Sequence, residues 1–127
     1  MSTLPSADAY ASQTARYEPL TVIDVLAEQA AVLARYSNQP LLDINAACLR
    51  LAVFEECYRW HRHPSSDELF LVVEGALEID LENGRCLVLG PWQCAVIPAG
   101  TVHRTRAQGR TVNLTVEEQH CVTEFLD

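Results

Sequence analysis

Apolar and polar residues alternate over short stretches through most of the chain beyond Pro40. A period of two is the pattern of a β-strand with one buried face, because successive side chains point to opposite faces. Turn-forming residues separate these stretches, which predict strands at 49–61, 68–74, 76–81, 85–89, 94–97, 102–106 and 111–117. Between two of them, Asn83-Gly84 predicts a two-residue hairpin with a type I′ turn. Many short strands at close intervals predict an all-β fold, an antiparallel sandwich or barrel.

Ahead of Pro40 the apolar period changes to that of a helix. Apolar residues between 22 and 36 follow one helical face, and Thr21 is a suitable N-cap with Asp24 three residues later. The polar residues before Pro40 end the pattern. The sequence therefore predicts one N-terminal helix over about 21–36.

The length of 127 residues is enough for one domain with its own core. Residues 1–19 are rich in Ser, Thr and Ala and show little apolar period, so we expect a flexible or partner-packing N-terminal arm there. A single domain is then expected over 20–127.

Charge and cysteine content exclude several classes of partner. The chain carries 9 Lys and Arg residues against 17 Asp and Glu, and its net charge of −8 disfavours nucleic acid and anionic membrane surfaces. It shows no signal-peptide pattern and no apolar stretch long enough to span a membrane. Five cysteines, an odd number without a C-x-x-C pair, favour reduced thiols over a disulfide framework. We therefore expect a cytoplasmic protein whose partner is a small molecule.

Four residues of metal-ligand type have a spacing that can bring them together. His61 and His63 lie two apart on one strand and share a face. Glu68 opens the next strand after a turn and can face the same interior, and a sharp turn at 98–100 precedes His103. A divalent metal would offset the cost of burying the Glu68 carboxylate. The alternative for the histidine pair alone is a half-exposed strand without a metal.

The same face contains candidates for a substrate pocket. Side chains expected to line it are Phe70, Val72, Val53, Thr105 and Asn113. Arg59 shares the parity of His61 and could hold a substrate carboxylate, unless a bulge in so long a strand inverts the assignment.

These motifs resemble those of the cupin superfamily. The pattern His61-x-His63-x4-Glu68-x6-Gly75 resembles the first cupin motif, and Pro98-x-Gly100-x-x-His103 resembles the core of the second. The resemblance covers about residues 45–117, and the stretch 60–75 is especially similar to small single-domain cupins of the mannose-6-phosphate-isomerase-like type. Three positions depart from the family pattern. Glu55 and Trp92 stand where glycine is usual, and Ala107 stands where asparagine is often found.

The resemblance implies a double-stranded β-helix, a jelly-roll barrel formed by two antiparallel sheets. It also implies that His61, His63, Glu68 and His103 bind one divalent metal ion per subunit, which could be Fe, Mn, Ni or Zn. Cupins of this size are commonly homodimers, often with an exchanged N-terminal segment.

Two functions follow from this resemblance and stay open. The first is a metalloenzyme acting on a small organic molecule, by oxygenation with iron or by isomerisation, decarboxylation or hydrolysis with another metal. The second is a noncatalytic ligand-binding or sensor module, because the same fold serves both purposes.

Overall fold

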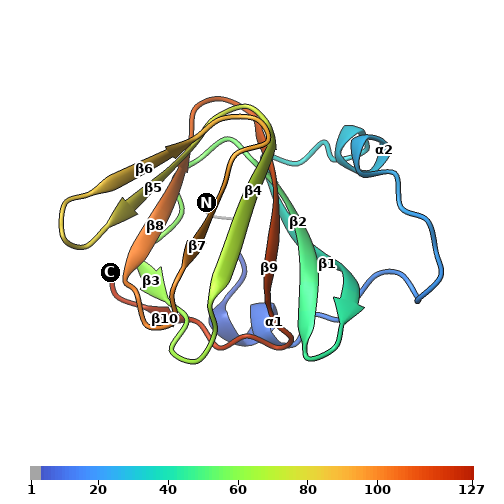
Figure 1. Cartoon of the computed structure of the whole chain (residues 1–127), viewed down its shortest axis with the longest axis horizontal. Helices are drawn as coiled ribbons and strands as arrows, with labels where there is room; N and C mark the ends of the chain where they lie inside the picture. Colours follow the sequence, from blue (N-terminus) through green and yellow to red (C-terminus); the bar gives the residue numbers. More distant parts are fainter. Residues whose placement is uncertain (1–3) are drawn as a thin grey trace.

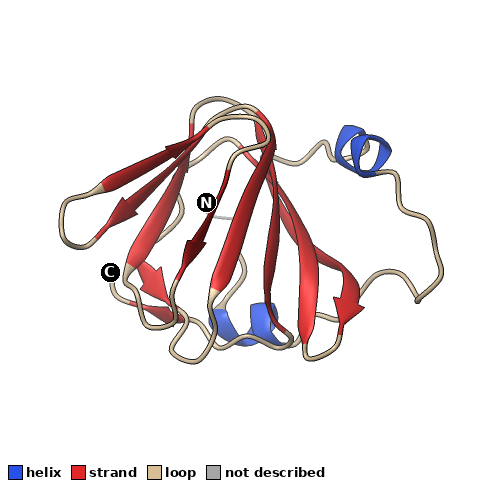
Figure 2. Cartoon of the chain, in the orientation of Figure 1, coloured by secondary structure: helices blue, strands red, loops and turns tan. Residues whose placement is uncertain are grey.

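The computed structural model describes residues 4–127 and contains two antiparallel five-stranded sheets that face each other (Figure 1, Figure 2). One sheet has the order β1 (Tyr36–Ile44), β2 (Ala47–Phe54), β9 (Thr111–Glu118), β4 (Glu68–Glu74) and β7 (Cys94–Ile97). The other has the order β10 (Glu124–Phe125), β3 (His61–Arg62), β8 (His103–Ala107), β5 (Leu77–Leu81) and β6 (Cys86–Leu89). The prediction of an all-β fold with two antiparallel sheets is confirmed.

The predicted strands differ from the observed ones mainly before residue 65. Strands β4 and β7 have the predicted bounds, β5, β6 and β9 differ by one residue at one end, and β8 is shifted by one residue. The predicted strand 49–61 is wrong, because β2 ends at Phe54 and the next strand begins only at His61, with a single bridge from Cys57 to Arg106 between them. Strands β1 and β10 were not predicted.

The predicted helix over 21–36 is also wrong in its length. Helix α2 spans only Val25–Ala30, and its N-cap is Asp24, whose side chain accepts hydrogen bonds from Leu26 N and Ala27 N. Tyr36 begins β1 instead, where it is paired with Phe54 of β2. Backbone pairing across the sheet replaces the local helical pattern there. No helix within residues 4–127 has the length and apolar character needed to cross a lipid bilayer.

The arm predicted over 1–19, flexible or packed on a partner, is described from residue 4 onward. Tyr10, Arg16 and Tyr17 contact the barrel of their own chain, and packing on a partner chain stays a prediction. Helix α1 (Ala7–Ala11) is capped by Ser6 and lies at the lower end of the barrel in Figure 1. Tyr10 is buried, and the backbone N–H groups of Arg16 and Tyr17 donate to β1 carbonyls at 3.0 Å each. Hydrogen bonds and burial therefore fix this segment.

The sheet that contains β1, β2, β9, β4 and β7 has the longer strands and is called the large sheet here. It separates two apolar clusters. The inner cluster lies between the sheets and includes Phe54, Phe70 and Ile79. The outer cluster includes Leu51 and Val53, which alternate with inner residues along β2. Tyr17, Ile23, Val25 and Val32 from the N-terminal segment pack against this outer cluster.

Along β9 the polar residues face inward. Thr111, Asn113, Thr115 and Glu117 are all buried, and they alternate with apolar residues on the outer face. Because β9 is the central strand of the large sheet, this polar stripe runs through the middle of the inner wall.

The turn at Asn83-Gly84 differs from the sequence-based expectation. Gly84 has φ +91°, but Asn83 does not take a positive φ, so the predicted type I′ turn is wrong. Gly84 N instead donates to Leu81 O at 3.1 Å, in a longer turn. Trp92, at a position where the family pattern has glycine, takes φ +64°, so the left-handed conformation is kept without a glycine.

Gly75 and Gly84 allow a matched test of backbone packing. A Cβ at Gly75 would lie 2.7 Å from Arg110 O, whereas a Cβ at Gly84 would have no neighbour within 4 Å, and both residues have positive φ. We expect Gly84→Ala to cost about 1–2 kcal/mol of unfolding free energy from backbone strain alone. Gly75→Ala should cost about 1–3 kcal/mol more because of the clash. Chemical denaturation of both variants measures the difference, and equal losses would contradict it.

Candidate metal centre

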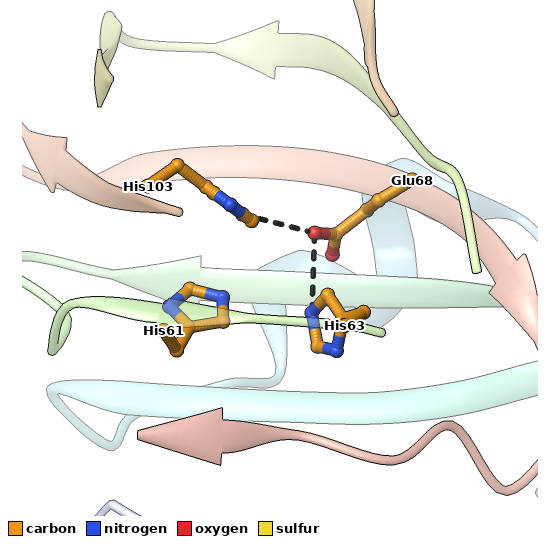
Figure 3. A group of neighbouring side chains, drawn as sticks. All are labelled: His61, His63, Glu68 and His103. Carbon is orange, nitrogen blue, oxygen red and sulfur yellow. Dashed lines mark ion pairs between the residues drawn. The ribbon is translucent and has the colours of Figure 1, made fainter. Parts of the chain in front are cut away.

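Four buried side chains from three segments converge at one point between the sheets (Figure 3). His61 lies on β3 directly opposite His103 of β8, His63 follows the end of β3, and Glu68 begins β4. One ligand atom from each residue lies within 4.8 Å of the others. The four residues singled out in the sequence are therefore brought together as a cluster that could bind a metal.

Glu68 is the common partner in this cluster. Its Oε1 lies 3.4 Å from His63 Nε2 and 3.4 Å from His103 Nε2. These separations are close to the roughly 3.0 Å between two ligands at right angles on one ion with bonds of about 2.1 Å. Glu68 Oε1 and His103 Nε2 are buried and have no hydrogen-bond partner among the described residues. Both atoms gain a partner if a cation occupies the centre, so the residues fit a divalent metal.

Backbone carbonyls orient the three imidazoles. Each Nδ1 contacts a carbonyl oxygen, which leaves Nε2 free to face the centre when Nδ1 carries the proton. The distances are 2.8 Å from His61 to Arg59, 3.1 Å from His63 to Val122 and 2.9 Å from His103 to Thr101. This arrangement supports Nε2 coordination by all three rings.

The turn before β4 and the turn before β8 hold each other in place. Asp67 Oδ1 accepts a hydrogen bond from Ala99 N at 2.9 Å, and Gly100 N donates to His63 O at 2.9 Å. Gly100 has φ +80°, which glycine adopts at little cost. Asp67 is exposed and structural, whereas its neighbour Glu68 faces the centre, as alternation along a strand requires.

Burial and neighbouring groups set the protonation of the cluster. Burial lowers the pKa of His61 to about 4, so this ring is neutral at pH 7. Burial opposes ionisation of Glu68, but its contacts with His103 and His63 outweigh this and hold the pKa of the carboxyl well below its usual range. Burial also disfavours protonation of His63, but interactions with Cys121 and Glu68 raise its pKa to about 11. Without a metal, His63 is therefore a cation beside the Glu68 anion.

A small cavity adjoins the cluster. The centre of a water molecule can reach about 40 Å³ of it, and His61, His63 and Glu68 form part of its wall. This volume corresponds to about three water molecules, so only a small molecule or a small end of one fits. Of the residues predicted to line it, Phe70, Thr105 and Asn113 do so.

Three predicted pocket residues lie elsewhere. Val53 is buried in the outer apolar cluster, because alternation along β2 turns it away from the cavity. Arg59 is half-exposed, pairs with Asp127 at 2.9 Å, and stacks over the Phe125 ring at 3.9 Å. The break between β2 and β3 removes the continuous alternation on which its assignment depended. Val72 is fully buried in the inner apolar cluster and does not reach the cavity.

The sequence analysis missed the residues of the cavity wall that lie outside the two metal-ligand motifs. Tyr36 and Asn38 lie on the unpredicted strand β1, Tyr10 lies on α1, and Tyr58 lies in the break between β2 and β3. The sequence of β1, YSNQPLLDI, shows no regular alternation of apolar and polar residues, so local sequence gave little signal for this strand.

Behind the cavity lies a second buried polar group formed by Tyr10, Arg50 and Glu117. The Tyr10 hydroxyl donates to Glu117 Oε1 at 2.6 Å, and the Arg50 guanidinium lies 3.8 Å from the centre of the Tyr10 ring. Arg50 also donates to Asn38 Oδ1 at 2.8 Å. Burial, followed by the nearby Glu68 carboxylate, raises the pKa of Glu117. Tyr10 also stacks on His63, so this group adjoins the metal cluster.

Comparisons with known proteins agree with this geometry. The family model described as a cupin domain matches residues 54–118. The uncharacterized protein YdbB of Bacillus subtilis (strain 168) is 44% identical over 104 residues, which are 82% of this chain and 92% of YdbB.

Solved structures share the fold. A cupin-2 domain protein of Shewanella frigidimarina NCIMB 400 is 26% identical with a TM-score of 0.72, over 76% of this chain and 94% of that protein. An uncharacterized double-stranded β-helix protein of Klebsiella pneumoniae subsp. pneumoniae MGH 78578 is 15% identical with a TM-score of 0.69, over 84% of this chain and 96% of that one. At that lower identity the second likeness concerns the fold alone.

Loss of one ligand candidate should be visible in metal affinity. We expect His61→Ala to weaken Zn²⁺ or Mn²⁺ binding by more than about 100-fold, because the change removes a donor atom from the centre itself. Titration calorimetry with elemental analysis measures this. His120→Ala is the matched control, because His120 is exposed and outside the cluster. Unchanged metal stoichiometry in the His61→Ala/His63→Ala double variant would show that the cluster is not the binding site.

Metal binding should also release a proton from His63. With a pKa of about 11, His63 is protonated at pH 8 in the metal-free protein, and the metal must displace that proton. His61, with a pKa of about 4, releases none. We expect about one proton per ion from His63 and an affinity that rises about tenfold per pH unit between pH 7 and 9. Calorimetry in buffers of different ionisation enthalpy counts the protons, and a count of zero at pH 8 would be the opposite result.

Proposed function

Because this chain belongs to the cupin family and gathers three imidazoles and one carboxylate at a buried point, we propose that it is a metalloenzyme acting on a small organic molecule. The observation that carries the proposal is that Glu68 Oε1 and His103 Nε2 are buried and make no hydrogen bond among the described residues, beside a cavity of small volume. Atoms that a metal would satisfy therefore lie where a substrate could reach the metal.

Four atoms would hold the metal: Nε2 of His61, His63 and His103, and a carboxylate oxygen of Glu68. The candidates are iron, manganese, nickel and zinc, all of which accept imidazole and carboxylate ligands. When bound, such an ion polarises a coordinated oxygen of the substrate, and iron in addition supports oxygen chemistry.

The residues of the chain contribute position, protonation and exclusion of water. The carbonyl contacts at Nδ1 hold the three rings in one orientation, so little rearrangement is needed on binding. Burial raises the pKa of Tyr10 and Tyr58, so both hydroxyls keep their protons at neutral pH. Phe54 and Phe70 cover the cavity with apolar surface. The site is therefore shielded and pre-organised.

The charges around the cavity narrow the class of substrate. Among the described residues, no lysine or arginine side chain lines it. The buried Arg50 lies behind Tyr10, where it stacks on the ring and donates to Asn38. A phosphate would therefore find no guanidinium or ammonium partner in the cavity wall. This favours a small substrate without a phosphate group.

The second candidate is a noncatalytic binding module. The aromatic side chains of Tyr36, Phe54 and Tyr58 in the cavity wall favour it, because such walls also suit capture of a small molecule without turnover.

The two functions differ in turnover. The test incubates the metal-loaded protein with a panel of small carboxylates, thiols, catechols and sugars. An oxygen electrode measures oxygen consumption, and NMR detects product formation. We expect one class to be converted, with conversion lost in His61→Ala and kept in His120→Ala. Tight retention of a ligand without conversion would support the binding module instead.

A further inference from the structure

Two polar side chains of β9 face the cavity with atoms that have no partner. Asn113 is 1% exposed and Thr115 is 2% exposed, and both line the cavity beside the metal cluster. Within the described part of the chain, Asn113 Oδ1 and Thr115 Oγ1 make no hydrogen bond. A buried polar atom without a partner destabilises the folded state, so these two residues do not serve stability.

Thr111 shows what a satisfied residue on the same face looks like. It is also on β9, is 0% exposed, and does not line the cavity. Its Oγ1 donates to Ala76 O at 3.0 Å and lies 3.2 Å from Gly109 O. Away from the cavity, the inward-facing Thr111 is therefore hydrogen-bonded. At the cavity, the inward-facing Thr115 makes no hydrogen bond.

The neighbours of Asn113 and Thr115 do not compete for their polar atoms. Asn113 is paired with Ala52 of β2 and Val72 of β4, neither of which has a polar side-chain atom. Thr115 is paired with Phe70 of β4. On its other side stands Arg50, whose guanidinium is directed to Asn38 and Tyr10. Neither Asn113 Oδ1 nor Thr115 Oγ1 has a hydrogen-bond partner among the described residues, so both atoms can bind a molecule in the cavity.

We infer that Asn113 and Thr115 form a recognition wall that hydrogen-bonds an uncharged hydroxyl or amide group of the bound molecule. An asparagine amide and a threonine hydroxyl each donate and accept, which matches groups of that kind. The absence of lysine and arginine from the described cavity wall leaves an anionic group no partner at this end. The inference rests on the proposed function for the other end of the molecule, which would face the metal cluster.

The first test compares two threonine-to-valine changes in the metal-free, ligand-free protein. Thr111→Val loses a satisfied hydrogen bond and should lower the melting temperature by about 3–5 °C. Thr115→Val removes an unpartnered hydroxyl at nearly constant volume, and the melting temperature should stay the same or rise. An equal loss in both variants would overturn the inference, since the Thr115 hydroxyl would then have a structural partner.

The second test measures recognition directly in the Zn²⁺-loaded protein. 3-Hydroxypropionate and propionate share a carboxylate and differ in one hydroxyl, and NMR titration compares their affinities. We expect the wild type to prefer 3-hydroxypropionate by about 2- to 10-fold, the range for one neutral hydrogen bond. Thr115→Val and Asn113→Leu should reduce the preference, while Thr111→Val should keep it. An unchanged preference in both cavity variants would overturn the inference.

Elemental analysis of each protein separates this inference from the proposed function. If zinc is bound but the preference does not depend on Asn113 or Thr115, the recognition wall fails and the metal site stands. If no zinc is bound, the proposed function fails, and the melting temperatures of the two valine variants still decide whether Thr115 is structurally satisfied.

Discussion

The site depends on the contacts of the buried Glu68 carboxylate with His63 and His103. Glu68 is 5% exposed, lies inside a barrel with a largely apolar interior, and is held in its ionised form by His63 and His103. A buried anion is costly unless cations or hydrogen-bond donors surround it. The turn pairing at Asp67 and Ala99 and the carbonyl contacts of the three imidazoles keep these rings in place around it. The local structure around Glu68 is therefore organised to receive positive charge.

The polar inner face of β9 leaves apolar side chains on the outer face of the large sheet. Because β9 turns Thr111, Asn113, Thr115 and Glu117 inward, its apolar residues face outward. That outer surface needs a cover, and residues 17–32 supply it by packing on the outer apolar cluster. The N-terminal segment therefore covers part of the apolar outer face of this sheet, although it contributes no metal-ligand candidate.

The sequence predicted the parts of the fold that local patterns determine. Strands β4 and β7 follow from alternation, and the grouping of His61, His63 and Glu68 follows from their spacing, since each depends on residues close in sequence. His103 lies in a separate segment and was added through its own turn motif and the family resemblance. The errors occur where long-range contacts decide. Tyr36 continues a helical pattern, but pairing with Phe54 across the sheet draws it into β1. The position of Arg59 depends on a strand break, and the ion pair with Asp127, 68 residues away, is not visible in local sequence.

Some residues of the site lie within the region that matches the family model, and others lie outside it. All four metal-ligand candidates lie within residues 54–118, the region that matches the family model. Tyr10, Tyr36 and Asn38 in the cavity wall lie outside that region, and Tyr10 is tied to Glu117 and stacks on His63. The region that matches the family model therefore contains the whole candidate metal cluster, while the shape of the space beside it also depends on segments that the family model does not cover. Tyr10, Tyr36 and Asn38 complete the wall of the cavity, so its shape cannot be derived from the family region alone.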